Sequence, residues 1–71
     1  MFIYIYDGEN EYIINSYAIS KVVRAVSGSS FYIDYKDGTR DNFCFADSIR
    51  CQECYVRVIE ALIPTMKEDN K

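Results

Sequence analysis

The chain has 71 residues, of which 49% are hydrophobic and 15% aromatic, and a formal net charge of −3. A chain of this length forms one domain with a thin core, and such domains commonly bind a metal or oligomerise. Direct nucleic-acid binding is not expected, because it needs clustered Lys and Arg, which are scattered here. No secretory or membrane-spanning segment is expected, and three cysteines without a signal peptide indicate a reducing compartment, the cytoplasm.

The first three strands are predicted from runs of β-branched and aromatic residues between turn signals. Phe2–Tyr6 and Glu11–Asn15 flank Asp7-Gly8-Glu9-Asn10, which is typical of a hairpin turn. Ile19–Val26 is predicted as the third strand, and Ser27-Gly28-Ser29-Ser30 as the turn after it.

The last two strands, Phe31–Lys36 and Arg40–Phe45, are predicted to form a hairpin whose register follows from the loop. A two-residue loop of Asp37 and Gly38 would mix apolar and polar side chains on one face. A three-residue loop from Lys36 to Gly38, with Gly38 left-handed, separates them, and we predict that loop. The apolar face is then Phe31, Ile33, Tyr35, Phe43 and Phe45, and the outward face is Tyr32, Asp34, Arg40 and Asn42.

Ser48–Ile63 is predicted as a helix, with Asp47 or Ser48 capping its first turn and Pro64 compatible with a stop at Ile63. Residues 67–71 are predicted to be a solvated tail, so the domain is residues 1–66. The predicted fold class is therefore α+β: an antiparallel sheet of about five strands, a meander of hairpins, with a single C-terminal helix packed on one face.

The predicted helix is apolar over roughly twice the arc of about 100° that covering one sheet requires. One stripe, which we predict to cover the sheet, is Ile49, Val56, Ile59 and Ile63. Other apolar residues lie around the cylinder, and they predict contact with a protein partner. The residues predicted to bind this partner are Cys54, Tyr55, Val58 and Leu62, with the outward Tyr32.

Cys44, Asp47, Cys51 and Cys54 lie within eleven residues at the strand-to-helix junction. Zn²⁺ accepts thiolate and carboxylate ligands together, so one interpretation is a structural zinc site that pins the helix to the sheet. The alternative is that Cys51 and Cys54 are small buried hydrophobes and Asp47 is an N-cap, because the predicted register turns Cys44 away from the helix. A redox role fits less well, since Cys51 lies nearly a turn inside the helix.

No enzymatic activity is predicted. The chain contains no histidine, so the usual general base is missing, and no Gly-rich phosphate-binding loop follows a strand.

In size, acidity and architecture the whole chain resembles the small phage-encoded inhibitors that include the anti-CRISPR proteins of type II systems, although no motif is shared. The resemblance implies stoichiometric binding to a host defence nuclease such as Cas9 in the host cytoplasm, which would block guide or target loading without catalysis. The alternative is a self-associating structural or regulatory protein, a homodimer through the helix.

Overall fold

The computed structural model describes residues 1–25 and 28–69, with side chains up to Pro64. Within these residues the chain forms five strands, a short 3₁₀ helix and one α-helix. The elements are β1 (Phe2–Tyr6), β2 (Glu11–Asn15), η1 (Ser16–Ala18), β3 (Ile19–Arg24), β4 (Ser30–Tyr35), β5 (Arg40–Cys44) and α1 (Ser48–Asp69). Val26 and Ser27, in the predicted third strand and the turn after it, lie outside the described residues.

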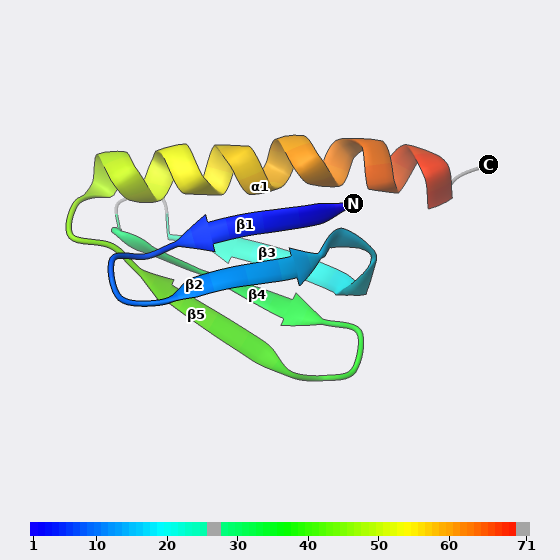
Figure 1. Ribbon diagram of the computed structural model, residues 1–71, viewed down its shortest axis with the longest axis horizontal. Helices are drawn as coiled ribbons and strands as arrows, with labels where there is room; N and C mark the ends of the chain where they lie inside the picture. Colours follow the sequence, from blue (N-terminus) through cyan, green and yellow to red (C-terminus); the bar gives the residue numbers. More distant parts are fainter. Residues whose placement is uncertain (26–27, 70–71) are drawn as a thin grey trace.

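The strands form two antiparallel sheets, the hairpin β1–β2 and the three-stranded sheet β3–β4–β5. The predicted α+β class with a C-terminal helix is confirmed, but the strands do not join into one sheet. Between β2 and β3, η1 redirects the chain, and the Asn15 side chain caps this turn by accepting a hydrogen bond of 3.1 Å from the Tyr17 amide. Figure 1 shows α1 running lengthwise beside β1, with both sheets on the same side of the helix.

The predicted register of the last hairpin is confirmed. Phe31 pairs with Phe43, which places both rings on the same face of the sheet. The loop has three residues, since the Tyr35 amide donates to the Thr39 carbonyl at 2.9 Å. Gly38 has a φ of +92°, a left-handed conformation that costs glycine little because it has no Cβ.

One core lies between the two sheets and α1. Its buried apolar side chains are Ile3, Ile5, Ile14, Ile19, Phe31, Ile33, Phe43, Cys51, Cys54 and Val58. The Tyr12 ring of the first hairpin meets the Phe43 ring edge-on, with centroids 4.8 Å apart, and Phe31 stacks on Phe43 at 5.1 Å. The β1–β2 hairpin therefore covers part of the sheet face that the helix alone was predicted to cover.

The predicted orientation of the helix is wrong. The stripe predicted to cover the sheet faces outward except for the half-buried Ile59, with Ile49 69% exposed and Ile63 46% exposed, whereas Val58 is 0% exposed. A helix that lies on a surface must present an apolar residue to it at every turn. The outward stripe has Gln52 and Glu53 where its next apolar residue should stand. The buried series meets this requirement, and it comprises Cys51, Cys54, Val58 and the half-buried Leu62.

Asp47, one of the two residues predicted to cap the helix, caps α1. Its Oδ1 accepts a hydrogen bond of 2.8 Å from the Arg50 amide. The predicted end at Ile63 is wrong, since Pro64 lies inside the helix, which continues to Asp69. Proline removes one helical hydrogen bond and disfavours the helical conformation before it, but it does not forbid that conformation. The predicted tail therefore begins as helix, and residues 70 and 71 lie outside the described part of the chain.

Candidate interaction surfaces

The five residues predicted to bind a partner do not form an exposed surface. Cys54 and Val58 are buried in the core, and Leu62 packs against it. The Tyr55 ring meets Phe31 edge-on at 5.8 Å. Tyr32 lies on the outer face of β4 beneath Arg40. These positions follow from the orientation of α1, which turns the predicted contact side into the core.

The four candidate zinc ligands do not form a metal-binding group. Cys44 is exposed, Cys51 and Cys54 are buried, and the Asp47 carboxylate caps the helix. In the described part of the chain, no three His, Cys, Asp or Glu side chains are placed to hold a metal ion. Burial raises the pKa of the Cys54 thiol, which favours the neutral form. The geometry therefore supports small buried hydrophobes, and it gives the zinc hypothesis no support.

Large apolar side chains gather on the outer face of the β1–β2 hairpin. Phe2 is 71% exposed and Ile13 is 77% exposed, and Tyr4 and Tyr6 are also exposed. The pairing of Tyr4 with Ile13 places all four on the same side of the hairpin. We call these four residues the hairpin face. The alternation of side chains along a strand could have predicted the hairpin face from the sequence, because Ile3 and Ile5 turn inward and their neighbours must then turn outward.

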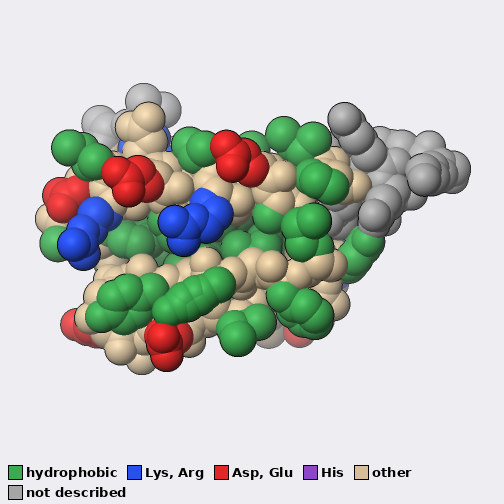
Figure 2. Space-filling model, turned by 45° about the horizontal axis from the view of Figure 1, so that its top comes forward, with side chains coloured by type: hydrophobic (Ala, Val, Ile, Leu, Met, Phe, Trp, Pro, Cys, Tyr) green, Lys and Arg blue, Asp and Glu red, His purple; other side chains and the backbone are tan. Residues whose placement is uncertain are grey.

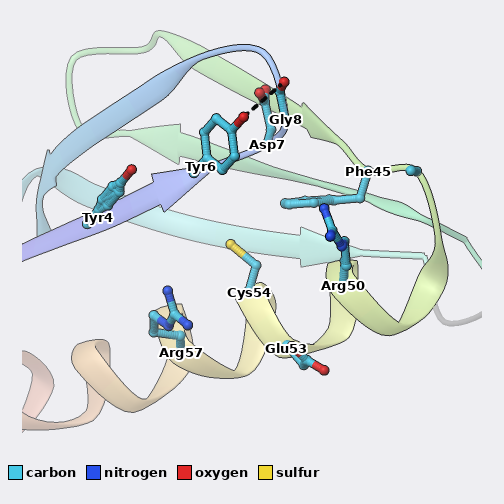
Figure 3. A pocket seen from close by; sticks show the side chains of 10 residues that line it. Tyr4, Tyr6, Asp7, Gly8, Phe45, Arg50, Glu53, Cys54 and Arg57 are labelled. Carbon is cyan, nitrogen blue, oxygen red and sulfur yellow. Dashed lines mark hydrogen bonds between the residues drawn. The ribbon is translucent and has the colours of Figure 1, made fainter.

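A groove of about 250 Å³ separates β1 from the first half of α1. Figure 2 shows positively charged side chains of the helix across this hollow from a row of hydrophobic side chains. In Figure 3, Arg50 rises from α1 to the Phe45 side chain, Arg57 lies on the side of α1 that faces Tyr4, and Glu53 points away from the groove. Tyr4 and Tyr6 line the opposite side of the groove.

The groove is lined by two basic side chains, Arg50 and Arg57, and two acidic ones, Asp7 and Glu53. Neither the Arg50 nor the Arg57 guanidinium makes a hydrogen bond or ion pair with any described residue. The carboxylate of Asp7, at one end of the groove, accepts hydrogen bonds from the amides of Asn10 and Glu9 at 2.8 and 2.9 Å. These bonds hold the pKa of Asp7 below its usual range, so this carboxylate is ionised but already bound within its own turn.

The outer side of α1 carries a second apolar row. Ile49, Val56 and Ile63 are seven residues apart and exposed. A helix completes nearly two turns in seven residues, so these three side chains form a narrow stripe along the helix.

Comparison of the chain with family models, with curated proteins and with solved structures found no match. Among the described residues, no helix combines the length and the apolarity that crossing a membrane requires.

Proposed function

We propose that this chain is a non-enzymatic protein-binding module and that the hairpin face contacts its partner. The observation that carries the proposal is the exposure of four large apolar side chains on one hairpin of two five-residue strands. Soluble monomers rarely expose contiguous apolar patches unless the patch binds something. Tyrosine also suits interface cores, because it adds contact area and a polar hydroxyl at low entropic cost.

The test replaces Ile13, the most exposed of the four, with Asp. Because Ile13 lies in solvent, Ile13→Asp leaves the fold intact, which circular dichroism checks. At an interface the new carboxylate is buried unpaired, so partner capture is lost. Gln52→Asp is the control, because it adds the same charge at an exposed position of α1 that belongs to neither candidate surface. Equal capture of the same protein by wild type and Ile13→Asp rejects the hairpin face as the contact.

The resemblance to anti-CRISPR inhibitors gives this proposal one specific form, in which the partner is a nuclease of the Cas9 type. Wild-type protein in stoichiometric excess then blocks DNA cleavage by the purified nuclease with its guide, and Ile13→Asp does not. Undiminished cleavage with wild-type protein, whether it is added before or after the guide, rejects the nuclease as partner.

A second candidate is a homodimer through the outer side of α1. The observation that favours it is the seven-residue spacing of exposed Ile49, Val56 and Ile63, which is the spacing of one position in a two-helix coiled coil. Native mass spectrometry of untagged protein then gives twice the chain mass, and Val56→Asp returns it to the monomer. A monomer at concentrations of about 50 μM rules out a dimer tight enough to be functional.

A further inference from the structure

The outer surface of the β1–β2 hairpin carries an acidic side chain beside the hairpin face. Glu11 pairs with Tyr6 across the hairpin, so its side chain lies on the same side as the four apolar residues. The Tyr4 hydroxyl donates a hydrogen bond of 2.7 Å to the Glu11 carboxylate. This bond holds the exposed carboxylate at the level of Tyr4, on the β2 side of the surface.

A basic side chain lies on the other side of β1. Arg57 is exposed, and it lies on the side of α1 that faces Tyr4 (Figure 3). Its guanidinium has no hydrogen-bond or ion-pair partner among the described residues. Glu53, one helical turn earlier, points away from the groove (Figure 3). The charge that α1 presents beside Tyr4 is therefore positive.

The two charges flank the apolar side chains of β1 on opposite sides. Across the surface the order is Arg57 on α1, Tyr4 on β1, and Glu11 on β2. In Figure 2, positively charged side chains of the helix lie on one side of the row of hydrophobic side chains, and a negatively charged side chain lies on the other. A surface with opposite charges on its two sides is complementary to a second copy of itself that is turned over.

A two-fold axis parallel to β1 makes use of this arrangement. In an isologous dimer the same patch meets itself, so every contact occurs twice. Such an axis exchanges the α1 side of the surface with the β2 side and keeps each level along the strand. Because Arg57 and Glu11 both lie at the level of Tyr4, Arg57 of each copy then meets Glu11 of the other. The hairpin faces cover each other between these two ion pairs.

We propose that the hairpin face is the interface of a two-fold symmetric homodimer, in which Arg57 of each copy pairs with Glu11 of the other. This inference rests on the proposed function and names the partner as a second copy of the chain. A foreign partner needs the inverse arrangement of charges, whereas a second copy supplies it by symmetry. The apolar side chains provide the buried area, and the ion pairs select the orientation.

Sedimentation velocity of untagged protein tests for the dimer and for its surface. Wild-type protein at about 50 μM is expected to sediment as a dimer. Ile13→Asp buries an unpaired charge in the interface and should give a monomer. Val56→Asp and Gln52→Asp, both on α1, should stay dimeric. A monomeric wild type, or a dimer that Ile13→Asp leaves intact, overturns the inference.

Charge reversal tests the two-fold arrangement without a change at Ile13. Glu11→Lys and Arg57→Glu each bring like charges together at both contacts, so each variant should dimerise at least tenfold more weakly than wild type at low salt. An equal mixture of the two variants should dimerise again. In the mixed pair one contact is the native Arg57 with Glu11, and the other joins the introduced lysine and glutamate. Native mass spectrometry identifies the mixed dimer by its mass.

Lys36→Glu is the matched control, because it makes the same change of charge as Arg57→Glu in the β4–β5 loop and should leave the dimer unchanged. Circular dichroism checks that each variant folds. Single variants that dimerise as tightly as wild type, or a mixture that stays monomeric, overturn the symmetric contact. These experiments use this chain alone, so their failure rejects the second copy as partner. The hairpin face itself is judged separately by partner capture with Ile13→Asp.

Discussion

The two hairpins of this molecule have similar turns and inner faces but different outer faces. Both turns use Asp-Gly, with φ of +101° at Gly8 and +92° at Gly38. On the outer face of β4–β5, Arg40 donates to Asp34 at 2.6 Å and its guanidinium lies 4.0 Å above the Tyr32 ring. The β1–β2 hairpin has the apolar hairpin face in the same place. The turns do not cause this difference, because the strand side chains alone decide whether an outer face suits water or a partner.

The hairpins also differ in how many of their strands lie at a sheet edge: both strands of β1–β2 do, but only β5 of β4–β5 does. Phe31 of β4 has partners on both sides, because it pairs with Phe43 of β5 and with Arg24 of β3. β1 pairs with β2 alone among the described strands, and α1 packs beside it. The hairpin face therefore belongs to a two-stranded sheet that no described strand extends on either side.

The largest expected effect on stability is the difference between removing a buried and an exposed phenylalanine ring. Phe43→Ala removes a fully buried ring and should destabilise the fold by about 3–5 kcal/mol, whereas Phe2→Ala on the hairpin face should change stability by less than about 0.5 kcal/mol. Urea denaturation measures both. If Phe43→Ala does not fold, Phe43→Leu gives a smaller loss that can be measured. Similar losses for Phe2→Ala and Phe43→Ala would place the hairpin face in the core.

The same comparison applies to the two sides of α1. Val58 is buried and Val56 is 42% exposed. Val58→Ala should cost about 1–3 kcal/mol through lost burial and a small cavity. Val56→Ala should stay within about 0.5 kcal/mol of wild type, because alanine's higher helix propensity offsets the lost contacts. Thermal or urea unfolding compares the two, and a larger loss for Val56→Ala would restore the helix orientation predicted from the sequence.

The features predicted correctly depend on neighbouring residues. The register of β4–β5 follows from a three-residue loop and the alternation of side chains beside it, and the cap at Asp47 follows from one side chain and the next turn. The orientation of α1 depends on distant residues, because the β1–β2 hairpin fills part of the sheet face. A local signal also existed, because Gln52 and Glu53 interrupt the stripe predicted to cover the sheet, but the prediction did not use it.

The candidate site was predictable only in part. Alternation in β1 is enough to place Phe2, Tyr4 and Tyr6 on one face. It does not show that this face stays uncovered, since a third sheet layer or the helix could have covered it. The groove needs the position of α1 beside β1, which no local pattern contains. The cysteine cluster gave a misleading signal, because closeness in sequence at a strand-to-helix junction put Cys44 and Cys51 in different environments.

The smallest expected effect is on the pH dependence of stability, to which the polar outer face of β4–β5 contributes. The hydrogen bond from Arg40 is the main cause that holds the pKa of Asp34 below its ordinary value of 3.8. A carboxyl group whose pKa is lower in the folded chain stabilises it above its unfolded pKa, and this contribution disappears as the pH falls through the folded pKa. Stability to urea should therefore fall below about pH 4 in the wild type. Asp34→Asn should be less stable than wild type at pH 6 and approach it as the pH decreases. Arg40→Gln should flatten the same profile by removing the donor, and parallel pH profiles for wild type and both variants would show that this ion pair does not contribute to stability.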